Sequence, residues 1–117
     1  MIPANVTIGV SGDWFAATGL NAGCEAYYSV VGGLFPNTLL DLTQAAQRGD
    51  AAEATRLSDR LQPLWELFKC AGSLRVVATA AELIGLVKGS CLPLPLKTYS
   101  GAFRNRIAAV IDELDLA

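Results

Sequence analysis

The hydrophobic and polar positions divide the chain near Pro36. Before it, two short apolar runs, residues 6–10 and 26–31, are rich in β-branched and aromatic residues and are bounded by glycine, which predicts two strands. Residues 14–20 between them predict a short helix, which the Asp13 side chain would cap. Because this intervening segment is long enough for a crossover, the pattern predicts a right-handed βαβ unit with parallel strands.

Helical spacing predicts that the chain after Pro36 is a series of amphipathic helices. The first begins at Pro36 and ends at Gly49, since proline suits a first turn and glycine suits the position after a helix. Asp50 and Glu53 form a capping box that begins the second helix. The apolar face of the first helix is expected at Leu39, Leu40, Thr43 and Ala46 or Gln47.

Prolines and glycines predict where the later helices end. Pro63 should break the second helix near Gln62. Residues 92–96 contain two prolines and should be extended, after which Ser100 caps a last helix. The expected apolar stripes are Leu57, Leu61, Leu64 and Phe68, then Leu74, Val77, Ala81 and Ile84, and finally Phe103, Ile107, Val110, Ile111 and Leu114.

The amino-acid composition indicates that much of the surface of the chain is covered by other protein. Hydrophobic residues make up 52% of the 117 residues and charged residues only 17%, which excludes disorder. No lysine or arginine precedes Arg48, so the first 47 residues are expected to be interior, as strands covered on both faces are. A chain of this size exposes much of its surface. We therefore expect large buried contacts, either with other copies of the chain or with missing sequence.

Charge and residue types exclude several classes of function. A net charge of −2 and a pI of about 4.9 argue against a nucleic-acid partner. The absence of histidine removes Ser-His-Asp and Cys-His nucleophile systems and histidine metal sites, and no metal site is expected. No phosphate-binding loop or dinucleotide fingerprint is present, so no cofactor is expected. The three cysteines form no CxxC pair, and no signal sequence or apolar run of membrane length is present, which predicts a cytoplasmic protein without a membrane partner.

Few residues offer catalytic chemistry. Ser11 lies in a sequence that resembles a nucleophile elbow but ends in Asp13 and lacks a histidine base, so a strand-to-helix turn is the preferred interpretation. Lysines that form Schiff bases need a buried amine. The three candidates lie at helix ends or in the late linker, where solvated lysines are expected: Lys69, Lys88 and Lys97. Tyr27 and Tyr28 should point to opposite faces of a strand, which places at least one of them in the core.

Several stretches in order resemble one known family. Residues 6–13, with the turn Ser11-Gly12-Asp13, and residues 23–30, ending in Tyr28-Ser29-Val30, are similar to two late strands of the dihydrodipicolinate synthase / N-acetylneuraminate lyase family. Residues 50–68 are similar to the helix that follows in that family, and residues 81–96 to the segment before its last helix. The resemblance covers essentially the whole chain.

This resemblance implies the C-terminal part of a (β/α)8 barrel, an α/β fold, with extra C-terminal helices. Residues 1–49 would be the last two βα units and residues 50–117 the helical extension, together one incomplete domain. Members of the family form a Schiff base between a lysine and the keto group of pyruvate or another 2-keto acid. Their catalytic lysine, proton-relay tyrosine and carboxylate-binding threonines lie earlier in the chain, so no catalytic residue is expected among these 117 residues.

The resemblance also implies substrate-binding residues. Gly12 would line the mouth of the active site, with Ser11 and Asp13 beside it. Tyr28, where the family usually has a small aliphatic residue, would offer its backbone carbonyl to the bound keto acid, with Ser29 next to it. Both positions agree with the location of barrel sites at the carboxyl ends of the strands.

Two functions are therefore compared. In the first, the chain is the C-terminal fragment of a Schiff-base keto-acid lyase or hydro-lyase and is inactive alone. It would bind a keto acid such as pyruvate only when the barrel is completed, by the missing N-terminal half or by another copy in a homo-oligomer. In the second, it is a non-catalytic, mainly helical interaction or oligomerisation module. Two parallel strands alone leave both sheet edges unpaired, which favours the first.

Overall fold

The computed structural model of the protein describes residues 2–89 and 91–116. The chain is mixed α/β and mainly helical, and the described residues contain one two-stranded sheet. It divides into two compact units, Met1–Arg60 and Leu61–Ala117.

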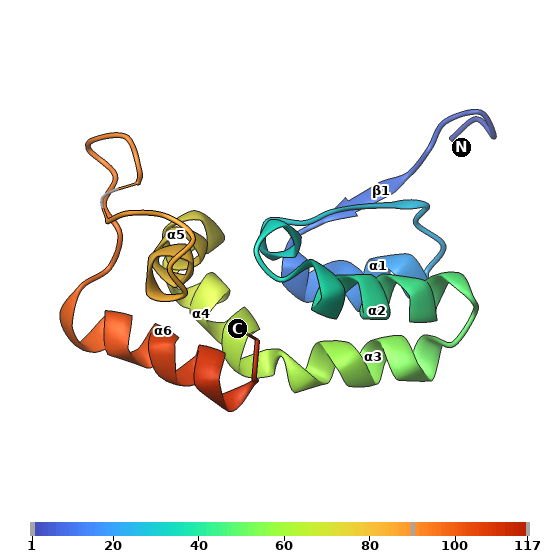
Figure 1. Ribbon diagram of the computed structural model, residues 1–117. Coiled ribbons are helices and arrows are strands. Elements are labelled where there is room, and N and C mark those ends of the chain that lie inside the picture. The colour runs from blue at the N-terminus through green and yellow to red at the C-terminus, as the bar shows by residue number, and fades with distance from the viewer. Residues whose placement is uncertain (1, 90, 117) are drawn as a thin grey trace. The chain divides into compact units, whose positions relative to one another are not determined.

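The first unit contains the sheet and three α-helices (Figure 1). Its elements are β1 (Gly9–Ser11), the 3-10 turn η1 (Asp13–Phe15), α1 (Ala16–Asn21), β2 (Ala26–Tyr28), the 3-10 turn η2 (Val31–Gly33), α2 (Pro36–Gln47) and α3 (Ala51–Arg60). The order strand, helix, strand confirms the predicted βαβ unit.

The two strands pair in parallel, as predicted, with Val10 opposite Tyr27 and Ser11 opposite Tyr28. Each strand has only three residues: β2 lies within the run 26–31, whereas β1 begins late in the run 6–10 and ends one residue beyond it. Val6, Ile8 and Val30 of those runs are exposed in this chain. A strand is defined by its ladder, and among the described residues each strand has one neighbour only.

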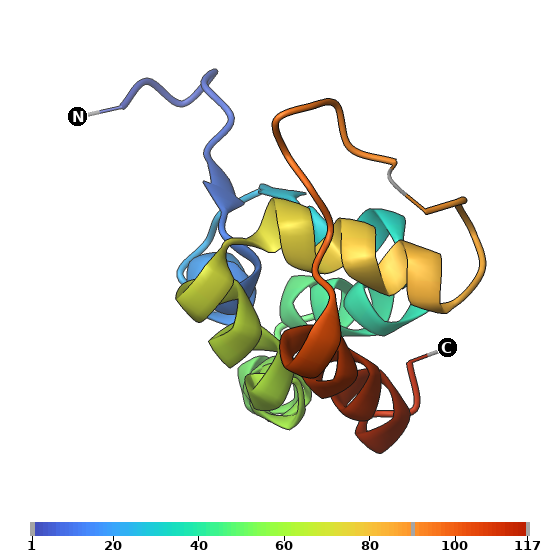
Figure 2. The ribbon, with the colours of Figure 1, turned by 90° about the vertical axis from the view of Figure 1, so that its left-hand side faces the viewer.

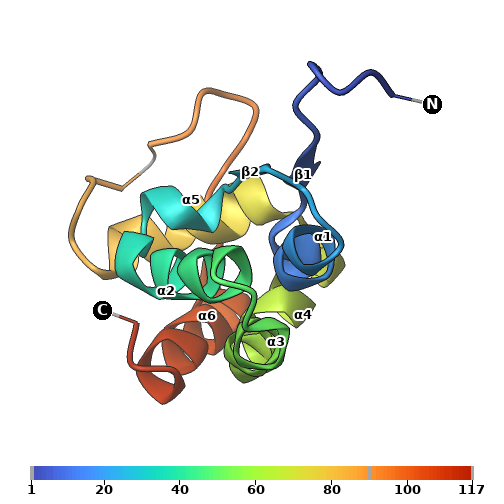
Figure 3. The ribbon, with the colours of Figure 1, turned by 90° about the vertical axis from the view of Figure 1, so that its right-hand side faces the viewer.

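The core of the first unit lies on one face of the sheet. Helices α1, α2 and α3 pack against one another there, with α3 on the side of α1 and α2 that faces away from the strands (Figure 3). Val10 and Tyr27 pack from the strands onto a cluster of Ala16, Ala17, Leu20, Leu42, Ala45 and Ala54. The other face carries Tyr28, which is exposed. The expectation that the strands are covered on both faces is therefore not met within the described part of the chain.

Helix α2 buries a different stripe from the predicted one. Its buried side chains are Leu39, Leu42 and Ala45, whereas Leu40 is 51% exposed. The row at intervals of three residues lies on one face of the helix, and contacts with α1 and α3 select it. Thr43 is half-buried, and its hydroxyl donates a hydrogen bond to the Leu39 carbonyl at 2.8 Å.

Helix α3 begins at half of the predicted capping box. The Glu53 amide donates to Asp50 Oδ1 at 3.2 Å, but the Glu53 carboxylate pairs with Arg56 at 2.6 Å. The helix packs against α1 and α2 within the first unit, which extends to Arg60.

Replacement of Asp50 by alanine should lower the free energy of unfolding by about 1 kcal/mol, because the substitution removes an N-terminal cap. Urea denaturation of the two chains measures the difference. Asp59→Ala, at an exposed aspartate in the last turn of the same helix, is the matched control and should not be destabilising. Equal losses for the two variants would contradict the capping role.

The second unit consists of three helices, α4 (Gln62–Ala71), α5 (Ser73–Leu83) and α6 (Gly101–Glu113). A long loop leaves the end of α5 and returns to the start of α6 (Figure 2). The break predicted at Pro63 is confirmed, since α3 ends at Arg60 and Pro63 lies in the first turn of α4. The predicted stripe of α6 is confirmed at Ile107, Val110, Ile111 and Leu114, which are buried, whereas Phe103 is only half-buried.

Three details of this unit differ from prediction. Helix α5 contacts both α4 and α6, and it buries Val76, Ala78, Thr79 and Ala80 while Leu74 is exposed. Residues 93–96 form a turn and are not extended, since the Leu96 amide donates a hydrogen bond to the Pro93 carbonyl at 3.0 Å. Each residue before a proline avoids the α region, but this local restriction does not keep the whole segment extended. Ser100 precedes α6, but its side chain makes no capping hydrogen bond.

Within residues 2–89 and 91–116, none of the helices combines the length and the apolar character needed to cross a membrane.

Candidate functional site

The carboxyl ends of β1 and β2 bring the five predicted site residues to one edge of the sheet. Ser11 ends β1, Gly12 and Asp13 follow it, and Tyr28 ends β2 just before Ser29. The parallel register places Ser11 directly opposite Tyr28. Two segments separated in sequence by α1 therefore meet at the edge where ligand sites of parallel α/β folds are found.

Asp13 is the centre of this edge. It is 2% exposed, and its carboxylate accepts three hydrogen bonds from β2 and the segment that follows β2. The donors are the Tyr27 hydroxyl, the Ser29 hydroxyl at 2.6 Å and the Val31 amide at 3.1 Å. The Ser29 Oγ accepts in turn from the Gly32 amide at 2.7 Å. Asp13 thus fixes the path of the backbone on both sides of Tyr28.

The predicted capping role of Asp13 is wrong. The residue before η1 is Gly12, no side chain caps that turn, and α1 begins only at Ala16. The carboxylate points to the neighbouring strand because it accepts three hydrogen bonds there, from Tyr27, Ser29 and Val31. As a helix cap it would accept only from a free amide of the first turn.

The backbone conformation at residue 12 requires a glycine. Its φ of +86° lies in the region that side chains disfavour, and an added Cβ would lie 3.2 Å from the Phe15 ring. This turn directs Asp13 inward while Ser11 stays exposed at the end of β1. Ser11 has no histidine available as a base, since the chain contains none.

Tyr27, which the sequence analysis considered only as one of two tyrosines with at least one in the core, belongs to this hydrogen-bonded cluster. It is half-buried, and its hydroxyl donates to Asp13. Burial raises the pKa of this phenol, and the Asp13 hydrogen bond and charge raise it further, against a smaller opposing effect of Ser29. The alternation of side chains along the strand was the available signal, because it places Tyr27 and Tyr28 on opposite faces of the sheet.

The stability of the chain should fall as pH rises above about 10, in part through Tyr27. Its pKa is raised in the folded state, so the stabilisation is complete below the unfolded pKa of 10.0 and is lost as the unfolded phenol ionises. Tyr27→Phe should therefore show a shallower decline, by up to about 1.4 kcal/mol per pH unit for one proton. Urea denaturation of both chains between about pH 8 and about pH 11, which bracket that pKa, measures how the free energy of unfolding changes with pH. Parallel curves would contradict the assignment.

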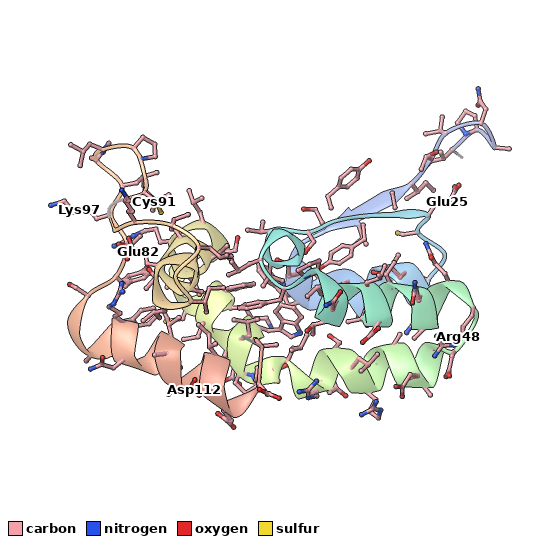
Figure 4. All side chains as sticks on the ribbon, in the orientation of Figure 1. Glu25, Arg48, Glu82, Cys91, Lys97 and Asp112 are labelled. Carbon is pink, nitrogen blue, oxygen red and sulfur yellow. The ribbon has the colours of Figure 1, made fainter. Side chains whose placement is uncertain are left out.

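The three candidate lysines do not lie at this edge. Lys69 is on α4, and Lys88 and Lys97 are on the loop between α5 and α6. All three are exposed, and Figure 4 shows the Lys97 side chain pointing outward from its loop. This agrees with the solvated role expected from the sequence. In the described residues, no group of three or more His, Cys, Asp and Glu side chains is placed to hold a metal ion.

Comparison with known proteins matches this fold and sequence to one family. The profile of the Dihydrodipicolinate synthetase family matches residues 4–114. The 4-hydroxy-tetrahydrodipicolinate synthase of Microcystis aeruginosa is 29% identical over 97% of this chain and 38% of its own length. The chain spans about a third of the length of the curated relatives that it matches.

Solved structures match the chain to the same family. Dihydrodipicolinate synthase from Agrobacterium tumefaciens has a TM-score of 0.90 and 41% identity over 97% of this chain and 38% of that one. The Acinetobacter baumannii dihydrodipicolinate synthase complexed with pyruvate shares the fold, with a TM-score of 0.86 and 18% identity over 96% of this chain and 38% of that one. The chain belongs to the Dihydrodipicolinate synthetase family.

Proposed function

We propose that the 117 residues are the C-terminal part of a barrel enzyme that forms a Schiff base with pyruvate or another 2-keto acid. They supply walls of the active site and no nucleophile. A keto acid would lie at the carboxyl ends of β1 and β2, against Gly12 and the backbone carbonyl of Tyr28, with Ser11, Asp13 and Ser29 beside it. The relatives' name, 4-hydroxy-tetrahydrodipicolinate synthase, supports a reaction of this family's class.

The uncovered face of the sheet carries this proposal. Val10 and Tyr27 pack under the helices, whereas Tyr28 is 67% exposed on the opposite face and Ile8, Val6 and Val30 of the flanking segments are also exposed. Exposed apolar side chains beside unpaired strand edges indicate a surface made to be covered. In a barrel, further strands cover both edges and this face becomes the interior.

The chemistry of the residues present supports a division of roles. A Schiff-base lysine must be buried to lose its proton at neutral pH, and the three candidates are exposed. The nucleophile would therefore come from strands that the 117 residues do not include. What this chain contributes is a rigid edge, held by Asp13, that presents backbone groups and short polar side chains to the substrate.

Borohydride trapping with pyruvate tests the proposal. The chain alone should show no covalent adduct by mass spectrometry. A chimera that joins the uncovered part of the Agrobacterium tumefaciens protein to this chain should gain one reduced pyruvate adduct, on a lysine outside the 117 residues. An adduct on Lys69, Lys88 or Lys97, or no adduct in a folded chimera, would contradict it.

A further inference from the structure

Tyr28 differs from the other described tyrosines in the hydrogen bonding of its hydroxyl. The Tyr27 hydroxyl donates to Asp13, and the Tyr99 hydroxyl donates to the Ala71 carbonyl at 3.2 Å. The hydroxyl of Tyr28 makes no hydrogen bond to the described residues, and its side chain is 67% exposed on the face of the sheet opposite the helices. A phenol in this position needs a partner once the face is covered.

Gly9 leaves room for the Tyr28 ring over β1. Ser11 is the register partner of Tyr28, but the ring leans over Gly9, two residues earlier on β1. A Cβ added at Gly9 would lie 2.6 Å from Cε2 of Tyr28, so the ring would have to shift if a side chain stood there. In this chain the phenol therefore lies over the surface of β1.

From this geometry, and resting on the proposed function, we propose that Tyr28 is a specificity-determining residue whose hydroxyl donates a hydrogen bond to an oxygen of the bound 2-keto acid. In a completed barrel, the face that carries Tyr28 and Gly9 lines the interior. Tyr28 is also the last residue of β2, at the end of the barrel where substrates bind. Inside the barrel the phenol would need a hydrogen-bond acceptor in place of water, and the oxygens of the bound keto acid would supply one.

The chimera described above tests this with the Tyr28→Phe variant, which removes only the hydroxyl. The pyruvate concentration for half-maximal borohydride trapping should rise about tenfold, the effect of losing one hydrogen bond to a charged ligand. Tyr99→Phe, which removes a phenol from the second unit, is the matched control and should leave that concentration unchanged. Gly9→Ala should raise it as well, because the new methyl group displaces the ring.

The outcomes separate this inference from the proposed function. If the unaltered chimera traps pyruvate and Tyr28→Phe traps it with the same concentration dependence, the role of Tyr28 is wrong and the proposed function stands. If Tyr28→Phe and Tyr99→Phe weaken trapping equally, the effect is not specific and the inference also fails. A folded chimera, verified by circular dichroism, that traps no pyruvate overturns both.

Discussion

Asp13→Ala should lower the free energy of unfolding of the chain by about 3 kcal/mol. The carboxylate is 2% exposed and satisfies the Val31 amide, the Tyr27 hydroxyl and the Ser29 hydroxyl. Alanine leaves these donors without an acceptor, and the loss is largest for the fully buried Val31, whose amide has no access to water. Urea denaturation at pH 7 measures the difference.

Two further variants make this result specific. Asp13→Asn keeps the shape and one acceptor but loses the charge, so it should fall between wild type and Asp13→Ala. Asp41→Ala removes an exposed aspartate from α2 and should change stability by less than about 0.5 kcal/mol. A loss below about 1 kcal/mol for Asp13→Ala would mean that the three hydrogen bonds contribute little to folding.

The same network links stability to the candidate site. Tyr27 and Ser29 flank Tyr28 in sequence, and both donate to the Asp13 carboxylate. The carbonyl and side chain of Tyr28 are therefore positioned by a carboxylate that itself lies beneath the surface. We therefore propose that Asp13, which lies beside the keto acid in the proposed site, acts by holding Tyr28 in position.

The location of the candidate site could be predicted from the sequence, whereas its internal bonding could not. Two β-like runs separated by a helix imply parallel strands, and parallel strands bring their carboxyl ends together. The partners of Asp13, however, are 14, 16 and 18 residues away. An aspartate after a strand suits an N-cap equally well, and only the register of β2 decides between the two.

The helix faces show a similar limit. Breaks at Pro63 and Gly49 follow from the covalent structure of proline and glycine, so they could be read locally. In α2, adjacent Leu39 and Leu40 allow two apolar stripes, and the pattern alone does not choose between them. The neighbours α1 and α3 bury Leu39 and leave Leu40 exposed.

The contact between α1 and β1 carries the second large effect. Gly19 lies on the face of α1 that meets Val10, and a Cβ there would lie 2.5, 2.7 and 3.0 Å from three Val10 side-chain carbons. Val10 is held in the core by the alanine-rich cluster, so it has little room to yield. Gly19→Ala should cost about 3 kcal/mol through overpacking, despite the better helix propensity of alanine. Thermal and urea denaturation of the chain measure the loss.

A double variant shows whether the cause is this one contact. Val10→Ala alone should be destabilising through the cavity it leaves, but combined with Gly19→Ala it makes room for the new methyl group. The double variant should therefore be more stable than the sum of the two single losses predicts, a coupling of about 1 to 2 kcal/mol. Gly33→Ala, where an added Cβ has open space, is the control and should be tolerated. Strict additivity of the two losses would place the cost of Gly19→Ala elsewhere, because two side chains that compete for one volume cannot act independently.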